Sequence, residues 1–336
     1  MTGVRRLGLA VLLAGLAAVP ARAAAPVGLC DTLGGSSSGL ILVLSAFPAE
    51  GAPLRKAGTF KKTVVLQGRN FYPGILEGVH VVLGLTGIGM VNAAATTEAA
   101  IGAFKPIAIV MSGVAGSSHR IADVVVASRW IEPPKKRHIP VNAAMLEVAR
   151  QGATALPAPL EHCATVPPTS ATGALVCMPF DPEVAFVDEG STSDPYGGMA
   201  APCSPGGGDV IGCDIPAPAV RATAAVAATP EVEDMETAEV ARVARRHGIP
   251  FVAMRAVSDG AGDPKGDRGF PAQFFDYYRL AADNAALVTR SVLAKVGRLA
   301  QDPAAKPVCR LLARHRWTAA AKRLRTASSN SPLTSQ

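Results

Sequence analysis

The stretch Val79-His-Val-Val-Leu-Gly-Leu85, followed by Thr86-Gly-Ile-Gly89, decides the fold class, because it joins an apolar run to a glycine-rich turn. An alanine-rich segment from Val91 to Phe104 then has the composition of a helix. Pro106 ends that helix, and Ile107 to Met111 has the length and composition of a buried parallel strand. Strand, turn, helix and strand together form the βαβ rhythm of an α/β fold.

Similar short elements lie on both sides of this unit. Further strands are predicted at Leu40–Leu44, at Val124–Ala127, from Asp209 and at Pro250–Val257, and helices at 141–151, Val232–Arg246 and Phe274–Leu299. Hydrophobic residues make up 49% of the 336 residues, enough for a sizeable core. We therefore expect a single α/β domain over 40–300, with three layers and a central mixed, mostly parallel, twisted sheet flanked by helices.

The segment from about 153 to 207 differs from the rest, because it is rich in Pro, Gly, Ser and Thr. A structureless loop of this length is uncommon in a compact domain, so we expect a loop-rich insertion pinned by disulfides. Six cysteines are present, none in a CxxC pair, and the four between 163 and 213 are expected to pair among themselves: Cys163, Cys177, Cys203 and Cys213, with Cys30 and Cys309 outside the group.

The amino terminus is typical of a secretory signal peptide. Arg5 and Arg6 precede an apolar run that ends at Val19, and Ala21-Arg22-Ala23 follows as a small-x-small cleavage pattern. The run is shorter than the roughly 20 residues that span a bilayer, so no stable membrane insertion is expected. We predict that residues 1–25 are removed on export, and that the protein is periplasmic or secreted.

The formal net charge of +7 is unevenly distributed. Residues 26–39 form a Gly/Ser-rich leader, which we expect to be flexible, and 301–336 form a basic tail. Seven basic residues and no acid lie in part of that tail: Lys306, Arg310, Arg314, Arg316, Lys322, Arg323 and Arg325. Without the tail and the signal peptide the domain has a slight negative charge, which argues against a nucleic-acid partner.

Four short motifs follow predicted strands or begin predicted helices. They are Ser45-Ala-Phe-Pro-Ala-Glu50, Thr86-Gly-Ile-Gly89, Asp234-Met-Glu236 and Arg255-Ala-Val-Ser-Asp259. Ligands of α/β sheets bind at the carboxyl ends of strands, so these motifs are expected to converge there. Among them, Thr86, Gly87 and Ser258 are candidate substrate-binding residues. No metal cluster, P-loop or dinucleotide fingerprint is visible, and no cofactor is expected.

A Met-Glu pair on a helix, followed one helix length later by a strand ending Arg-x-x-Ser-Asp, is a specific pattern. With Ser112-Gly-Val-Ala-Gly116, Asp123-Val-Val-Val and Gly208-Asp209, it resembles the nucleoside phosphorylase/nucleosidase superfamily. The resemblance is closest to the methylthioadenosine/S-adenosylhomocysteine nucleosidases and their exported relatives. It runs from Leu40 to Val288, interrupted by 153–207, and implies a phosphorylase/hydrolase-like fold and cleavage of the N-glycosidic bond of a purine nucleoside.

The resemblance assigns roles at the base and the ribose. Asp259 would protonate the leaving purine, a task that needs a raised pKa; a helix-capping Asp near Gly260 is the plainer interpretation. Glu236 would accept hydrogen bonds from the ribose hydroxyls and favour the positive charge that develops on the sugar. Met235 would pack beneath the ribose, although an ordinary core methionine has the same pattern.

Glu50 distinguishes water from phosphate as the nucleophile. A carboxylate orients water but repels phosphate, for which arginine is better suited. The resemblance makes Glu50 the water-binding residue and Arg255 its partner, while a solvated loop acid is the alternative. Arg55 is the candidate phosphate ligand of the rival interpretation, but it lies far from the strand in sequence.

One expected feature is missing. The resemblance implies an aromatic ring near Ile211 that stacks on the purine, and Asp209-Val-Ile supplies none. Phe180 or Phe186 are substitutes for it, and Phe275 is a candidate for the lining around the 5′ substituent or a core residue of its helix.

Three functions remain open: a purine nucleosidase, a phosphate-dependent purine nucleoside phosphorylase, and a non-catalytic exported nucleoside-binding or storage protein. The partner is expected to be a small-molecule purine nucleoside. The resemblance also implies a homodimer or larger homo-oligomer.

Overall fold

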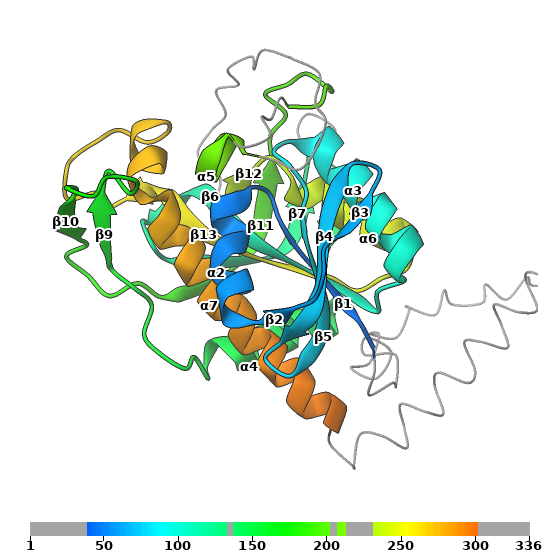
Figure 1. Ribbon diagram of the computed structural model, residues 1–336. Helices are drawn as coiled ribbons and strands as arrows, with labels where there is room; N and C mark the ends of the chain where they lie inside the picture. Colours follow the sequence, from blue (N-terminus) through cyan, green and yellow to red (C-terminus); the bar gives the residue numbers. More distant parts are fainter. Residues whose placement is uncertain (1–38, 133–136, 202–206, 213–230, 302–336) are drawn as a thin grey trace, which may run out of the picture.

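A computed structural model describes residues 39–132, 137–201, 207–212 and 231–301 (Figure 1). The predicted signal peptide, all but the last residue of the leader, nearly all of the basic tail, and four of the six cysteines lie outside these ranges. No helix of the described residues has both the length and the apolar character needed to cross a membrane.

The core of the molecule is one mixed sheet in the order β12-β11-β7-β13-β6-β1-β5-β4-β2, with β3 paired to β4 and β8 to β7. Its strands are β1 (Ile41–Ser45), β2 (Thr59–Phe60), β3 (Val64–Leu66), β4 (Arg69–Leu76), β5 (Val79–Leu85), β6 (Ala108–Arg120), β7 (Val124–Ile131), β8 (Ile139–Pro140), β11 (Val184–Thr192), β12 (Glu233–Asp234) and β13 (Phe251–Ala261).

The middle of the sheet is parallel, as the apolar runs predicted. Strand β1 pairs in parallel with β5 and β6, with Ile41 opposite both Val81 and Ala108, and β6 pairs in parallel with β13. Strand β4 runs antiparallel to β5, and β13 antiparallel to β7, so the sheet is mixed. Every residue of β1 is buried, because helices cover both faces of the sheet.

The helices are α2 (Pro48–Ala57), α3 (Met90–Phe104), α4 (Ala143–Ala153), the short α5 (Gly208–Ile211), α6 (Thr237–Arg246) and α7 (Ala272–Gln301). Figure 1 shows α3 and α6 together on one side of the sheet, while α2 and α4 contact α7 on the other. The predicted three-layer α/β architecture is confirmed. The helix predicted at Phe274–Leu299 is also confirmed, because it lies within α7.

The segment 153–207 is only partly a loop. It contains the hairpin β9 (Cys163–Val166) and β10 (Ala174–Cys177), closed by a Cys163–Cys177 disulfide, which confirms a pairing within the predicted group. The expectation of a loop-rich segment is wrong for β11, which pairs in parallel with both β7 and β12 inside the main sheet. The segment therefore supplies a strand of the core.

Two local predictions need correction. Asp209-Val-Ile, expected to begin a strand, lies in the single turn α5, with Asp209 ion-paired to Arg279 of α7. The helix predicted from Val232 begins only at Thr237, after the short strand β12. The cause is Asp234, whose Oδ1 accepts hydrogen bonds from the amides of Glu236 and Thr237 and so marks the helix start.

Candidate active site

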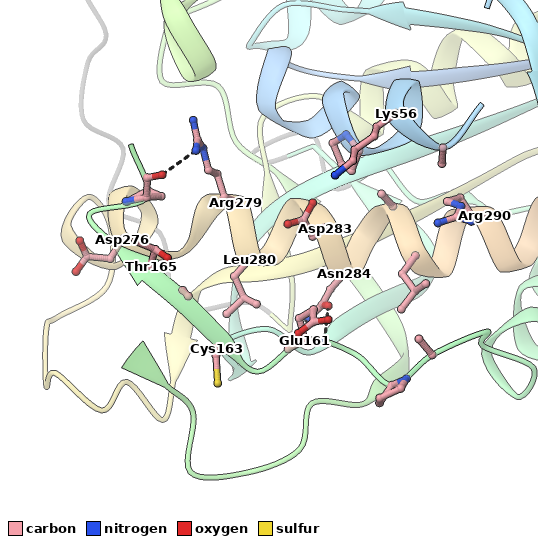
Figure 2. A pocket seen from close by; sticks show the side chains of 18 residues that line it. Lys56, Glu161, Cys163, Thr165, Asp276, Arg279, Leu280, Asp283, Asn284 and Arg290 are labelled. Carbon is pink, nitrogen blue, oxygen red and sulfur yellow. Dashed lines mark hydrogen bonds between the residues drawn. The ribbon is translucent and has the colours of Figure 1, made fainter. Parts of the chain in front are cut away.

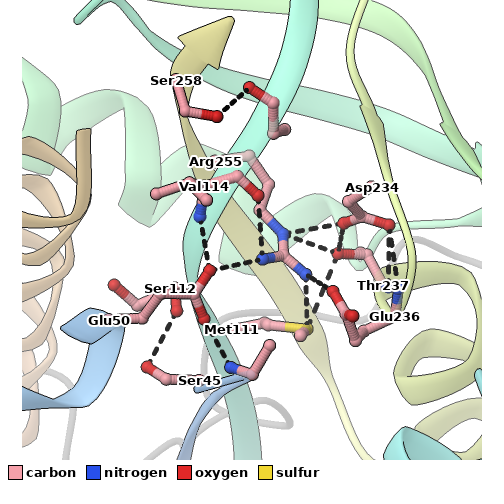
Figure 3. Close-up of polar contacts among 12 residues, drawn as sticks. Ser45, Glu50, Met111, Ser112, Val114, Asp234, Glu236, Thr237, Arg255 and Ser258 are labelled. Carbon is pink, nitrogen blue, oxygen red and sulfur yellow. Dashed lines mark hydrogen bonds and ion pairs between the residues drawn. The ribbon is translucent and has the colours of Figure 1, made fainter. Parts of the chain in front are cut away.

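The four predicted motifs meet at the carboxyl ends of the parallel strands. Glu50 lies in the first turn of α2 directly after β1, and Arg255 lies within β13. Glu236 precedes α6, and Gly89 precedes α3 at the end of the β5 turn. Figure 3 shows Arg255 between Glu50 on one side and Asp234 and Glu236 on the other. The sheet topology thus gathers residues more than two hundred positions apart.

Arg255 is the centre of this cluster. It is 0% exposed, and its Nε lies 2.8 Å from Asp234 Oδ2, its Nη2 3.2 Å from Glu236 Oε2 and its Nη1 3.6 Å from Glu50 Oε1. Three buried carboxyl groups therefore share one guanidinium. Buried charge is costly unless it is paired, so this excess of acid favours protonation of one of the three carboxyls.

Glu50 is held by backbone donors. Its Oε1 accepts a hydrogen bond from the Val114 amide at 2.7 Å, and its Oε2 accepts one from the Ala46 amide at 2.5 Å. Burial raises the pKa of Glu50, while the Arg255 charge and these amides lower it. A carboxylate with a raised pKa is a stronger base than a solvated one, as activation of water requires.

Gly113 makes room for this pair. A Cβ at Gly113 would lie 2.4 Å from both Arg255 Nη1 and Glu50 Oε1, so a side chain is excluded there. The glycine in the Ser112–Gly116 motif is thus explained by the close approach of two functional groups.

Glu236 faces the turn after β5. Its Oε1 accepts a hydrogen bond from the Gly89 amide at 2.8 Å, where Gly89 has a φ of 89°. Burial raises the pKa of Glu236 to about 8, with Arg255 lowering it and the charges of Asp234 and Glu50 raising it. The pKa of Glu236 therefore lies close to neutral pH, where both its ionised and its protonated form are present.

Asp234 fixes the geometry of the cluster. Its Oδ1 accepts a hydrogen bond from Thr192 Oγ1 at 2.6 Å, and its Oδ2 contacts both Arg255 and Thr237 Oγ1. Thr192 ends β11 and Thr237 begins α6, so Asp234 ties two elements to the guanidinium. Asp234 belongs to one of the four sequence motifs, but its role was not predictable from the sequence.

Asp259 lies at the other end of the site, on β13 beyond Arg255. The Ser258 hydroxyl donates to its Oδ1 at 2.7 Å, and a Cβ at Gly116 would lie 2.7 Å from its Oδ2. Burial raises the pKa of Asp259, with the Ser258 hydrogen bond lowering it. A carboxyl with this property can act as a general acid closer to neutral pH than an exposed Asp.

The remaining predicted residues vary in position. Thr86 is buried and hydrogen-bonded to the Gly87 carbonyl, Gly87 has a φ of 76°, and Met235 is half-buried beside Glu236 in sequence. Ile211 ends α5. Phe275 is exposed at the side of α7, with its ring 5.2 Å from that of Phe274.

Tyr196 is an aromatic ring that sequence reasoning missed. Its Cδ2 would lie 3.1 Å from a Cβ at Gly89, and burial together with the charge of Glu236 raises its pKa. Tyr196 follows β11, and because this strand was not predicted from the sequence, the position of Tyr196 was not predicted either. The suggested substitutes lie elsewhere: Phe180 packs under Arg120, and Phe186 under Arg150 of α4.

Arg55, the candidate phosphate ligand, points away from the cluster. It is exposed on α2, with its guanidinium 4.0 Å from the centre of the Tyr72 ring. Among the described residues, one group of three potential metal ligands lies close together: His162, Cys163 and Cys177. Both of its sulfur atoms are in the disulfide, so they are not thiolate ligands.

A separate pocket of about 740 Å³ lies between α2, α7 and the chain around residues 158–168 (Figure 2). Lys56, Arg279 and Asp283 line it, and Asn284 is held there by the backbone of Glu161. None of the predicted catalytic or substrate-binding residues lines this pocket.

Comparison with known proteins identifies the family. The model of the phosphorylase superfamily matches residues 40–179 and 210–294, and the chain belongs to this superfamily. The match continues to residue 179, so the interruption begins later than the expected residue 153 and contains β11.

Individual relatives are similar to long stretches of the chain. An uncharacterized protein of Mycobacterium tuberculosis is 36% identical over 185 residues, which cover 50% of this chain and 74% of that protein. A 5′-methylthioadenosine/S-adenosylhomocysteine nucleosidase of Chromohalobacter salexigens is 28% identical over 246 residues, or 68% of this chain and 86% of that protein.

The fold is shared with solved structures. The crystal structure of the 5′-methylthioadenosine/S-adenosylhomocysteine nucleosidase of Neisseria meningitidis, in complex with methylthio-immucillin-A, has a TM-score of 0.52 and 22% identity. The match covers 76% of this chain and 98% of that chain.

Proposed function

We propose that this protein hydrolyses the N-glycosidic bond of a purine nucleoside of the methylthioadenosine or adenosylhomocysteine type. The observation that carries the proposal is the buried pair of Glu50 and Arg255 at one end of the site and Asp259 at the other, with Glu236 near Arg255. The superfamily membership and the nucleosidases among the relatives support it.

The reaction needs a base for water and an acid for the purine. Water attacks C1′ of the ribose while the bond from C1′ to the purine nitrogen breaks, and the bonding electrons leave with the purine. Asp259 gives a proton to a ring nitrogen of the purine, and Glu50 takes a proton from the water. Burial has raised the pKa of both carboxyls, which suits proton transfer near neutral pH.

The ribose lies between these two groups in the proposal. Positive charge develops on the sugar as the bond breaks, and a carboxylate that binds the ribose hydroxyls stabilises that charge. Glu236 has this position, because Gly89 and Arg255 orient its two oxygens. Tyr196 supplies apolar surface near the same carboxyl, and in the proposal the half-buried Met235 packs beneath the ribose.

The charge at the nucleophile end favours water over phosphate. Three carboxyl groups surround the only guanidinium of the cluster, so an incoming phosphate would meet unfavourable charge. The orientation of Arg55 toward Tyr72 removes the candidate phosphate ligand from this end.

The test is release of free base from methylthioadenosine, adenosylhomocysteine, adenosine and inosine, with and without phosphate. We expect release in phosphate-free buffer, and a loss of about 100-fold or more in kcat for Glu50→Gln and Asp259→Asn. The matched controls Glu147→Gln and Asp181→Asn change exposed acids outside the site and should retain activity.

Two results would contradict the proposal. Release only in the presence of phosphate would make the protein a phosphorylase. Nucleoside binding without release of base under either condition would make it a binding protein.

A further inference from the structure

Glu233 lies next to the proposed general acid and has no role in the mechanism above. Strand β12 contains only Glu233 and Asp234. The side chains of the two acids diverge, because successive side chains of a strand point in opposite directions. Asp234 binds Arg255, whereas Glu233 accepts a hydrogen bond from the Ser193 side chain.

Gly116 separates Glu233 from Asp259 within the sheet. On one side Gly116 pairs with Glu233 of β12, and on the other it pairs with Asp259 of β13. The β13 ladder has register shifts on both sides of Asp259, so the Asp259 side chain departs from the regular alternation of its strand. The Asp259 carboxyl occupies the space where a side chain of Gly116 would lie, since its Oδ2 is 2.7 Å from that Cβ position. Asp259 thus extends toward β12 and Glu233.

The surroundings of Glu233 agree with this arrangement. Glu233 is half-buried, and the Ser193 side chain hydrogen-bonds to it. Burial raises the pKa of Glu233, and the charges of Asp234 and Asp259 raise it further. The site therefore has a second carboxyl at its base end, beside the group that protonates the purine.

We infer that Glu233 determines base specificity, by accepting a hydrogen bond from the amino group at C6 of the purine. The inference rests on the proposed function, because it places the base at Asp259. It concerns a residue that takes no part in bond breaking.

The chemistry of the purine edge supports the assignment. N7 lies in the same five-membered ring as the nitrogen that leaves the ribose, so we take N7 as the nitrogen that Asp259 protonates. The substituent at C6 is the neighbour of N7, so a carboxyl beside Asp259 is placed to meet it. An amino group at C6 donates a hydrogen bond, which a carboxylate accepts. An oxo group at C6 only accepts, so it would face a carboxylate without a proton between them, and such a pair is unfavourable.

The experiment compares methylthioadenosine with its 6-oxo counterpart, methylthioinosine, as substrates. We expect the wild-type protein to have a higher kcat/KM for the 6-amino substrate. Glu233→Gln should lower the ratio of the two values by about tenfold or more, because an amide can donate to an oxo group as well as accept from an amino group. The control Glu231→Gln changes an exposed acid two residues away and should leave the ratio unchanged.

Calorimetric binding of the free bases adenine and hypoxanthine provides a readout without turnover. Wild-type protein should prefer adenine, and Glu233→Gln should reduce that preference while its thermal unfolding stays close to that of the wild type. An unchanged ratio in Glu233→Gln, with both substrates hydrolysed, would overturn the inference and leave the proposed function intact. Failure of the wild-type protein to hydrolyse either substrate would instead overturn the proposed function.

Discussion

Glu236 shows how one residue can link stability and catalysis. Burial among Asp234, Glu50 and Arg255 raises its pKa to about 8. A carboxyl of an unfolded chain has a pKa of about 4.3. Between these values the folded protein binds a proton that the unfolded chain has lost, so the free energy of unfolding contributed by Glu236 decreases as the pH rises.

Glu236→Gln removes this dependence, because an amide does not titrate in that range. We expect the free energy of unfolding of the wild type to fall relative to that of Glu236→Gln between about pH 5 and pH 8, by at most about 1.4 kcal/mol per pH unit. Urea unfolding at a series of pH values measures both curves. Glu147→Gln, an exposed acid, should follow the wild type, and parallel curves for wild type and Glu236→Gln would contradict the prediction.

The elements differ in how far the sequence predicts them. Strand β1, most of β5 and the first residues of β6 are apolar runs next to glycine or small residues, and such runs are typical of parallel strands buried on both faces. Glu50, Glu236, Arg255 and Asp259 were also predictable, because each belongs to a motif at a strand end or helix start. The ion pairs among them confirm that the first three converge.

Strand β11 was not predictable from its local pattern. It contains Asp188, Glu189 and Gly190, and it lies in a segment rich in proline and glycine. Its partners β7 and β12 are distant in sequence, and Gly190 packs directly against the ring of Trp130 from β7. Long-range pairing overrides local composition here, and Tyr196 was missed for the same reason.

Substitution of two glycines, Gly113 of β6 and Gly102 of α3, tests how closely β6 packs against its neighbouring elements. A Cβ at Gly113 would clash with Arg255 and Glu50 of the neighbouring elements, whereas a Cβ at Gly102 meets nothing within 4 Å. We expect Gly113→Ala to lower the free energy of unfolding by about 1–3 kcal/mol and to abolish hydrolysis. Gly102→Ala should raise it by roughly 0.5–1 kcal/mol, since alanine favours a helix interior.

Thermal and urea unfolding, with base release as the activity measurement, distinguish the two variants. A Gly113→Ala protein that stays fully active would show that the close contact between Glu50 and Arg255 is unimportant for the reaction.

At the scale of the whole molecule, aromatic side chains gather beside the site. Phe47 precedes the helix that carries Glu50, and its ring lies 6.1 Å from that of Phe274. Phe274 in turn contacts Phe275 and Phe270, which are 53% and 60% exposed. Adjacent exposed aromatic residues mark interaction surfaces more often than isolated ones do.

This aromatic surface leads to a prediction about assembly. We expect a homodimer in which the surface around Phe270 and Phe275 is covered by a second copy, because burial of exposed aromatic rings favours association. Sedimentation equilibrium should give the mass of a dimer for the wild type. The dimer of the double variant Phe270→Ser with Phe275→Ser should dissociate at a higher protein concentration than that of the wild type. Val65→Ser changes an equally exposed apolar residue on β3 and should remain dimeric. Removal of water from the exposed aromatic rings is the driving force for this assembly. A wild-type protein that is monomeric and fully active would therefore contradict the prediction.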